Sequence, residues 1–245
     1  MGLRTKFNLG CVWRLTSGVV PSGPFKGMRY LPDVVGSTLA PKLIGTYERE
    51  LHGAISQIIA ASPSVVINVG AAEGYYAVGL ARAIPACRVI AFETGEKGQR
   101  LIRELAELNN VSSRVQVEGF CDMATLTGLL ESVGPAAIIM DIEGAEKELL
   151  DPQKIPGLKA CSVLVEVHEG KHPGLESMLL QRFSTTHQTT PFAQMDRVTS
   201  DFPISLPLWA KLLGNRFLLR AMNEKRASRV SWLFMENNTF SGGNA

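Results

Sequence analysis

The sequence predicts an α/β fold built on a doubly wound, mostly parallel sheet. Residues 65–81 combine an apolar run, a loop of small residues and a segment with helical periodicity, which together indicate strand, turn and helix. Residues 88–93, 136–141 and 162–166 are further apolar runs, and each ends in a carboxylate. Helical patterns lie between these runs, and strands that alternate with helices are typical of a parallel sheet covered on both faces.

The loop after the first predicted strand contains Gly70 and Gly74. Glycine lets a backbone turn sharply and approach a ligand closely, because it has no Cβ. Position 72 is alanine, so the loop departs from the dinucleotide pattern G-x-G-x-x-G, and no G-x-x-x-x-G-K-[ST] phosphate loop occurs. The spacing therefore favours a ligand with an amino-acid tail and a ribose, although an ordinary strand-turn-helix remains the alternative.

Glu93 ends the second predicted strand, 23 residues after Gly70. A carboxylate at this place can accept hydrogen bonds from both ribose hydroxyls of a nucleoside. Alternatively, it is an acid favoured by the dipole of the helix predicted for residues 95–110. The order of strand, acid and helix favours the ribose role.

The third predicted strand covers residues 114–119 and is followed by Cys121 and Asp122. A short polar side chain here can bind the exocyclic amine of an adenine, so Asp122 is the candidate and Cys121 a contact rather than a reactive thiol. Asp122 can also cap the helix predicted for residues 123–132, and the two roles are compatible.

Asp141 and Glu143 follow the fourth predicted strand, and His168 and Glu169 follow the fifth. Charged groups are costly to bury, so we expect them at the ligand crevice, where they are the candidate catalytic residues. His168 is the candidate base because imidazole titrates near neutral pH, and Glu169 or Glu143 would orient it. Two alternatives stay open: a structural histidine, or a divalent cation such as Mg or Mn held by Asp141, Glu143 and His168. The sequence cannot place these three residues around one ion, so we do not commit to a metal.

Two motifs carry a resemblance to a known family. Residues 68–74, Asn-Val-Gly-Ala-Ala-Glu-Gly, resemble motif I of class I S-adenosylmethionine-dependent methyltransferases. Residues 141–146 together with 166–168 resemble the FkbM-type branch of these enzymes, and the resemblance extends over residues 65–170 and more weakly over 43–51. It departs from the family at Glu73 and at residues 94–95, which weakens a substrate assignment more than the cofactor assignment.

The resemblance implies a seven-stranded sheet with an antiparallel last strand, and O-methylation of a small molecule such as a natural product or a sugar. It also implies a set of residues that bind S-adenosylmethionine: Asn68, Gly70, Ala71, Glu73, Gly74, Glu93, Cys121, Asp122 and Asp141. Two other classes of function stay open. A nicotinamide-dependent oxidoreductase is disfavoured by Ala72 and by the lack of a Tyr-x-x-x-Lys motif. The third class is an inactive module that only binds the cofactor.

The sequence predicts two parts. Residues 1–61 form an N-terminal arm with a helix and a possible lid at Tyr47 and Glu48, and residues 62–245 form the methyltransferase domain. The arm is expected to have a disordered beginning, and its helix to cover residues 46–60 with Thr46 as N-cap. Beyond residue 170 we expect a helix at 174–183, an irregular segment to Pro207 and a basic helix at 211–229 that packs on the domain rather than on an anionic substrate or a membrane. A strand at 231–236 and a disordered tail at 241–245 complete the prediction. Apolar anchors of the arm are Trp13, Phe25, Met28, Tyr30 and Leu31.

The composition fits one compact catalytic domain. Of 245 residues, 45% are hydrophobic and 20% charged, and the net charge of +2 is too small to indicate a nucleic-acid partner. The four cysteines are far apart and form no C-x-x-C motif, so the sequence indicates neither a zinc site nor a disulfide framework. No apolar run approaches the roughly 20 residues of a membrane span, and no signal region precedes Pro21. We therefore expect a cytoplasmic protein with a small-molecule substrate, and the oligomeric state stays open.

Overall fold

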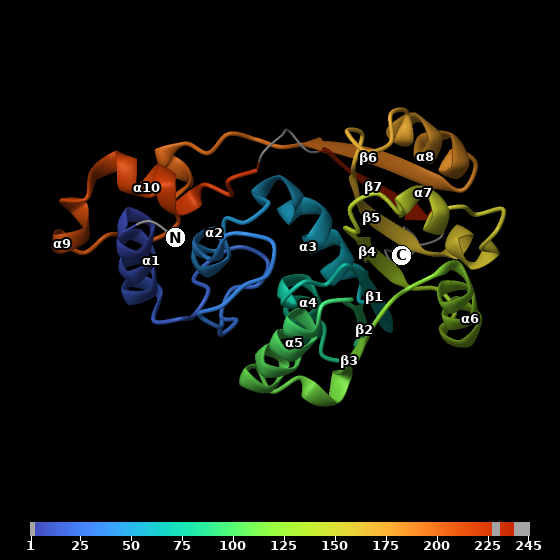
Figure 1. Ribbon diagram of the computed structural model, residues 1–245, viewed down its shortest axis with the longest axis horizontal. Coiled ribbons are helices and arrows are strands. Elements are labelled where there is room, and N and C mark those ends of the chain that lie inside the picture. Colours follow the sequence, from blue (N-terminus) through green and yellow to red (C-terminus); the bar gives the residue numbers. More distant parts are fainter. Residues whose placement is uncertain (1–2, 227–230, 238–245) are drawn as a thin grey trace.

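The computed structural model describes residues 3–226 and 231–237, and in this part the strands form one seven-stranded sheet (Figure 1). Their order across the sheet is β3-β2-β1-β4-β5-β7-β6, and the first five are parallel. β7 lies between β5 and β6 and is antiparallel to both, which confirms the predicted fold class and the reversed last strand. The strands are β1 (Val65–Val69), β2 (Arg88–Phe92), β3 (Val115–Glu118), β4 (Ala137–Met140), β5 (Ser162–Val167), β6 (His187–Ala193) and β7 (Ser231–Asn237).

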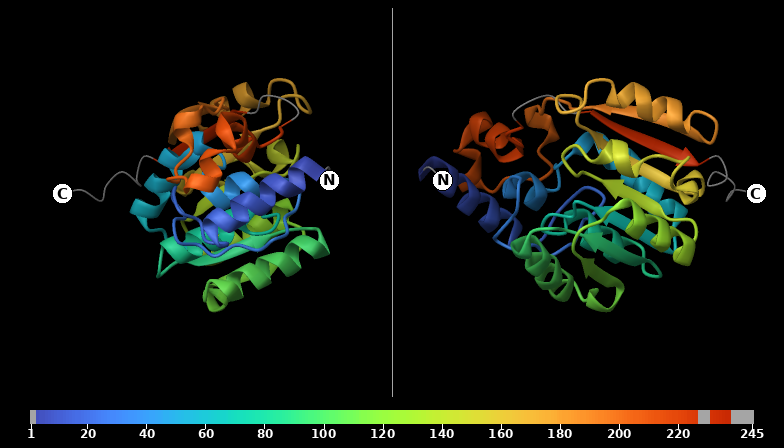
Figure 2. Two further views of the ribbon diagram at one scale, coloured as in Figure 1. Left: turned by 90° about the vertical axis from the view of Figure 1, so that its left-hand side faces the viewer. Right: turned by 45° about the vertical axis from the view of Figure 1, so that its right-hand side comes forward.

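Helices cover both faces of the sheet, as a doubly wound topology requires. α3, α4 and α5 pack on one face, whereas α6, α7 and α8 pack on the other (Figure 1). α1, α2, α9 and α10 gather beyond the carboxyl ends of the parallel strands, and Figure 2 shows α1 beside the C-terminal helices. The helices are α1 (Leu3–Thr16), α2 (Leu39–Ile44), α3 (His52–Ala61), α4 (Tyr75–Ala83), α5 (Glu96–Leu108), α6 (Met123–Val133), α7 (Glu146–Leu149), α8 (Leu175–Phe183), α9 (Leu208–Lys211) and α10 (Gly214–Met222).

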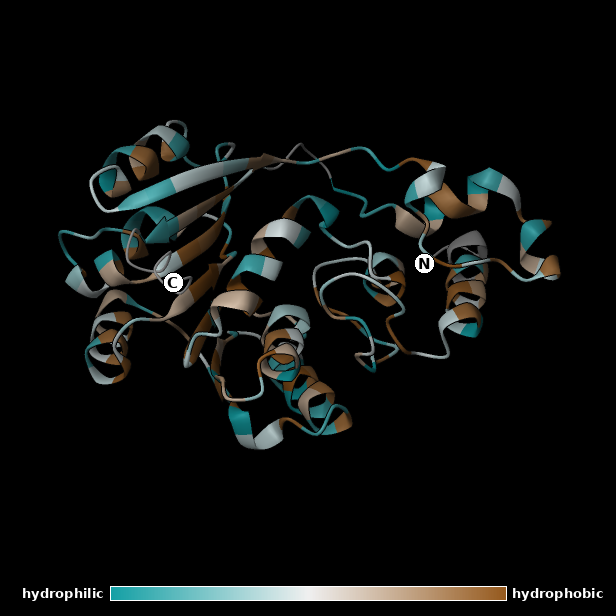
Figure 3. Ribbon diagram, turned by 180° about the vertical axis from the view of Figure 1, so that it is seen from behind, coloured by the Kyte–Doolittle hydropathy of each residue, from teal (hydrophilic) through white to brown (hydrophobic). Residues whose placement is uncertain are grey.

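The central strands are buried on both faces, and Figure 3 shows them as hydrophobic ribbons. Side chains alternate along β1, so that Val66 belongs to the core under α3 and α4 while Ile67 belongs to the core under α6 and α8. Because both faces are covered, a parallel strand needs apolar residues at successive positions. This is why the central strands appear in the sequence as continuous apolar runs.

The N-terminal arm packs on α4 through its predicted anchors. Phe25, Met28 and Tyr30 are buried, and the ring of Phe25 meets that of Tyr75 edge-on with 5.1 Å between centroids. A Cβ at Gly79 would lie 2.6 Å from the Phe25 ring, so glycine at this position lets the arm approach the helix. The predicted disordered beginning is wrong from Leu3 onward, where the chain forms α1.

Three further elements differ from the sequence prediction. The segment expected to be irregular contains β6, an edge strand that includes Pro191. The helix predicted from residue 46 begins later, with a 3-10 turn at Arg49–Leu51 before α3, because the backbone is left-handed at Glu48 (φ 45°). The basic segment predicted as one helix at 211–229 forms two, α9 at Leu208–Lys211 and α10 at Gly214–Met222, and α10 packs on the protein through Phe217 and Ala221, as expected. Residues 227–229 of that prediction and the tail 241–245 lie outside the described residues.

Within the described part of the chain, no helix is both long and apolar enough to cross a membrane.

Candidate functional site

A cleft of about 630 Å³ opens at the carboxyl ends of the parallel strands. It brings together six of the predicted site residues, from the ends of four strands: Gly70, Glu93, Asp141, Glu143, His168 and Glu169. Tyr47, from the possible lid, also lines it. The other predicted residues do not line this cleft: Asn68, Ala71, Glu73, Gly74, Cys121 and Asp122.

The glycine loop is held tightly between β1 and its neighbours. The amides of Gly70 and Ala71 donate to the carbonyl of Phe92 at 3.0 and 2.9 Å. Gly70 has φ 80°, and a Cβ there would lie 1.8 Å from the carbonyl oxygen of Asp141. Only glycine therefore fits this position, because β4 passes directly behind the loop.

Glu93 anchors the same loop from the end of β2. Its Oε2 accepts a hydrogen bond from the amide of Ala72 at 2.8 Å, and its Oε1 accepts one from the amide of Gly95 at 2.7 Å. Ala72 has φ 50°, an uncommon conformation for a residue with a side chain, and this bond supports it. Each carboxylate oxygen can accept a further hydrogen bond. Glu93 can therefore hold the loop and still accept from ligand hydroxyls.

Two predicted cofactor-binding residues lie beneath the loop. Asn68 is buried in β1, where its Nδ2 donates to the carbonyl of Ile139 at 3.4 Å. Glu73 is fully buried and accepts from the Tyr30 hydroxyl at 2.6 Å and from the Lys42 ammonium. Burial raises the pKa of Glu73, but the Lys42 charge and these hydrogen bonds outweigh it and lower the pKa overall. The Glu73 carboxylate thus ties the arm to the loop, a use that the sequence did not suggest.

After β3, Asp122 has the capping role that the sequence predicted as compatible with adenine binding. Asp122 Oδ1 accepts from the amide of Thr125 at 2.8 Å, so Asp122 is the N-cap of α6. Cys121 is buried, and burial together with the Asp122 charge raises the pKa of its thiol to about 12. The thiol therefore stays protonated at neutral pH. The contact of this pair with an adenine remains a prediction.

His168 stands at the end of β5 with carboxylates on both sides of its ring. Its Nδ1 lies 2.6 Å from Oε1 of Glu146, which is fully buried. Its Nε2 lies 3.6 Å from both Asp141 Oδ1 and Glu143 Oε2. Burial lowers the pKa of His168, but the Glu146 hydrogen bond and the three negative charges outweigh it, so that the pKa is raised above its usual 6.5.

The residue that orients His168 is Glu146, where Glu169 or Glu143 was expected. Glu169 uses both oxygens to accept from the amides of Gly174 and Glu176 at the start of α8, at 2.8 and 2.7 Å. Glu143 is ion-paired with Lys171 at 2.6 Å. Glu146 had a signal in the sequence, since it follows Glu143 by three residues within the FkbM-like motif.

Asp141, Glu143 and His168 could together hold a metal ion. One ligand atom from each of the three lies within 4.8 Å of the others. A histidine whose second ring nitrogen is bound to a carboxylate is the usual arrangement at metal sites. The same arrangement also suits a histidine that takes up a proton, because the carboxylate stabilises the resulting imidazolium.

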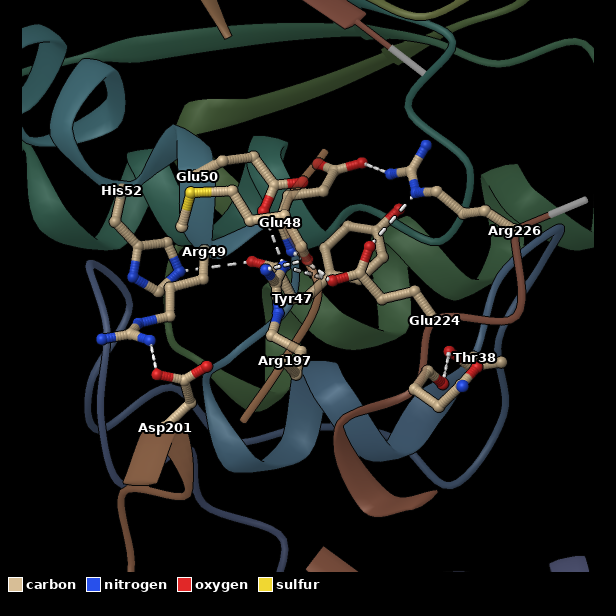
Figure 4. Close-up of polar contacts among 12 residues, drawn as sticks. Thr38, Tyr47, Glu48, Arg49, Glu50, His52, Arg197, Asp201, Glu224 and Arg226 are labelled. Carbon is tan, nitrogen blue, oxygen red and sulfur yellow. Dashed lines mark hydrogen bonds and ion pairs between the residues drawn. The ribbon is translucent and has the colours of Figure 1, made fainter. Parts of the chain in front are cut away.

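A buried ion-pair network (Figure 4) forms part of the wall of the cleft. The guanidinium of Arg226 meets the carboxylates of Glu48, Glu166 and Glu224, and Glu224 also pairs with Arg197 at 2.8 Å. Burial raises the pKa of Glu48 to about 7 and, together with the Asp141 charge, that of Glu166 to about 9. These partners come from distant parts of the sequence, so no local pattern indicated them.

No family model matches this chain, and no curated protein matches it either. Among solved structures, precorrin-6y C5,15-methyltransferase from Geobacter metallireducens is similar, with 10% identity over 79% of this chain and 90% of that chain at a TM-score of 0.50. The O-methyltransferase TomG from Streptomyces achromogenes, solved with SAM, has 13% identity over 97% and 92% of the two chains and a TM-score of 0.49. An O-methyltransferase from Bacillus cereus, solved with SAH, has 13% identity, 94% and 91% coverage and a TM-score of 0.48. The strand order β3-β2-β1-β4-β5-β7-β6 and the likeness to the precorrin-6y methyltransferase show that the chain has the class I methyltransferase fold.

Proposed function

We propose that the protein is an S-adenosylmethionine-dependent O-methyltransferase that acts on a small molecule. The observation that carries the proposal is the loop of Gly70 to Gly74, tied to Glu93 at the mouth of the cleft. This pairing provides a close backbone approach and a free acceptor for ribose hydroxyls. The FkbM-like motifs point to the same chemistry and suggest that branch of the methyltransferases.

The charge of the cleft supports a cationic cofactor. Lys171 and Arg226 are neutralised by Glu143 and Glu224, whereas the acidic residues Glu93, Asp141 and Glu169 form no ion pair with a lysine or arginine among the described residues. A sulfonium is positively charged and is favoured there, whereas the pyrophosphate of a nicotinamide dinucleotide would be repelled. This contrast argues against the oxidoreductase alternative. Of the cofactor-binding residues that the sequence predicted, Gly70, Glu93 and Asp141 line the cleft, and contacts of the others with the cofactor are proposals from the sequence alone.

S-adenosylmethionine, when bound, supplies a methyl group on a sulfonium. Transfer breaks the sulfur–carbon bond, forms an oxygen–carbon bond and leaves S-adenosylhomocysteine. The acceptor hydroxyl must lose its proton, and we assign this to Nε2 of His168. Glu146 holds the ring through Nδ1 and stabilises the imidazolium that forms. Asp141 and Glu143 lie beside Nε2 and favour its protonated state.

A divalent cation at Asp141, Glu143 and His168 would be a second way to acidify the hydroxyl. The two mechanisms make different predictions. With His168 as base, turnover withstands a chelator. With a cation, chelation abolishes turnover, and added Mg or Mn restores it.

Calorimetric titration with S-adenosylhomocysteine and, separately, with NAD tests the cofactor. We expect S-adenosylhomocysteine to bind at one site per chain and NAD not to bind. Binding of NAD alone would overturn the proposal. Cofactor binding without methyl transfer to any hydroxylated compound of a broad panel would identify the protein as an inactive binding module instead.

In the active enzyme, residues 1–61 would serve as the arm that covers the cleft, with Tyr47 over the cofactor.

A further inference from the structure

A second cavity, of about 640 Å³, lies between the N-terminal arm and α10. Its walls are largely apolar and include Leu9 of α1, Val34, Leu39 of α2 and Ala221 of α10. Pockets that enclose small organic ligands have volumes of about 300–1,000 Å³ and are mostly apolar. The size and lining of this cavity therefore suit a small organic molecule.

The cavity adjoins the cofactor cleft. Ser37 and Lys225 line both spaces. Along the arm, Val34 and Thr38 face the cavity while Val35 and Gly36 face the cleft. A molecule in the cavity thus lies directly beside the space where the methyl group would be transferred.

Two cations at the cavity have no ionic partner within residues 3–226 and 231–237. Arg220 and Lys225 are exposed, and neither forms an ion pair with any described residue. Among the described residues of the lining, the carboxylate is Asp33, and it is already paired with Lys97 at 2.8 Å. The positive charge at this wall is therefore available to an anionic group on a ligand.

The contacts between the arm and the C-terminal segment hold the cavity in shape. Thr38 Oγ1 donates to the carbonyl of Asn223 at 3.4 Å, and Glu224 accepts from the amide of Glu48 at 3.0 Å (Figure 4). α1 and α2 also pack against α10. A preformed pocket binds without the cost of ordering its walls.

We propose that this cavity binds the methyl acceptor, and that the acceptor combines an apolar body with an anionic group. The apolar body lies among Leu9, Val34 and Ala221, and the anion lies beside Arg220 and Lys225. The hydroxyl that receives the methyl group then extends past Ser37 into the cleft. The identification of the ligand as the acceptor rests on the proposed function, whereas the binding of an amphiphilic anion does not.

Two fluorescent probes that differ in charge test this inference on the full chain saturated with S-adenosylhomocysteine. Anilinonaphthalene sulfonate has an apolar body and an anion, and phenylnaphthylamine has nearly the same body without charge. We expect the sulfonate to bind at one site per chain. Ala221→Phe and Val34→Trp fill the cavity and should weaken both probes by roughly tenfold or more. Leu219→Phe adds an aromatic ring to the same helix outside the cavity lining and should leave both affinities unchanged.

The charge is tested by Arg220→Gln and Lys225→Gln, which should weaken the sulfonate and leave phenylnaphthylamine unchanged. If both cavity-filling variants bind the probes with wild-type affinity, the inference is overturned. If the glutamine variants lose affinity equally for the charged and the uncharged probe, the anionic part of the inference is overturned. The affinity for S-adenosylhomocysteine is measured in parallel by calorimetry. If S-adenosylhomocysteine binds but the cavity-filling variants do not change the affinity for the sulfonate, only this inference fails. If the sulfonate binds in the cavity but S-adenosylhomocysteine does not bind the protein, the proposed function fails instead.

Discussion

At the scale of single residues, Glu93 has two duties: it supports the glycine loop through Ala72 and, in the proposed function, binds the ribose. Glu93→Ala should weaken the binding of S-adenosylhomocysteine by about 1.5–3 kcal/mol, the range for hydrogen bonds to a charged group. Calorimetric titration measures the change. The matched control is Glu96→Ala, an exposed acid in the first turn of α5, which should keep wild-type affinity. An unchanged affinity in Glu93→Ala would remove the ribose assignment.

In the proposed function, His168 sets how the rate depends on pH. A base must be unprotonated, so kcat/KM should rise with pH through the His168 pKa, which lies above 6.5. Glu146→Gln removes a charge that raises this pKa but keeps an acceptor for Nδ1, so the acidic limb of the profile should move to lower pH. His168→Ala should lower the rate by roughly 10²–10⁴ while S-adenosylhomocysteine affinity stays intact. An acidic limb that stays in place in Glu146→Gln would exclude His168 as the base.

Some residues of the site could be predicted from the sequence and others could not. Glu93, Asp141 and His168 follow apolar runs, and the parallel topology carries strand ends to one edge. Glu73 lies within a recognisable motif, yet its carboxylate binds Lys42 and Tyr30. Such pairs join positions far apart in the chain, and no local period or spacing encodes them.

At the scale of elements, the loop after β1 is tightly constrained by its neighbours. Gly70→Ala places a Cβ against the Asp141 carbonyl and requires a positive φ of a residue with a side chain. We expect a lower melting temperature and loss of S-adenosylhomocysteine binding, measured by thermal unfolding and calorimetry. Gly128→Ala is the control, because a Cβ there meets nothing within 4 Å. It lies inside α6 and should be neutral or stabilise the protein by about 0.5–1 kcal/mol. Normal binding by Gly70→Ala would show that the loop tolerates displacement.

The elements that the sequence misrepresented share a physical cause. β6 is an edge strand with mostly polar residues and a proline, and an edge strand needs neither apolar continuity nor every backbone donor. The start of α3 is set by the left-handed turn at Glu48, whose carboxylate is held by Arg226 and Tyr76. Central strands were predictable because burial on both faces imposes an apolar run. Tertiary contacts determine the rest.

At the scale of the whole molecule, Glu48 joins the arm, α4 and the C-terminal segment. Its pKa in the folded protein is about 7, above the ordinary 4.5, so the unfolded chain loses this proton first as the pH rises. The free energy of unfolding should therefore fall by about 3 kcal/mol between pH 4.5 and 7 through this group alone, and then level off.

Denaturant unfolding of wild type and Glu48→Gln at several pH values measures this effect. The variant cannot ionise at position 48, so the difference between the two free energies should change across that pH interval and stay constant above it. Glu107→Gln, on the exposed side of α5, should follow wild type at every pH. Parallel curves for wild type and Glu48→Gln would show that this carboxyl titrates normally.

The place of β7 between β5 and β6 also governs how the chain can fold as it is synthesised. The parallel strands and their helices leave the ribosome first and can assemble in order. Until residues 231–237 emerge, β5 is the last strand of the parallel sheet, and its backbone groups on that side have no partner strand. An unpaired apolar strand edge is a template for pairing with other chains. The edge of β5 is therefore open to pairing with another chain until Ser231–Asn237 has been synthesised and pairs with it.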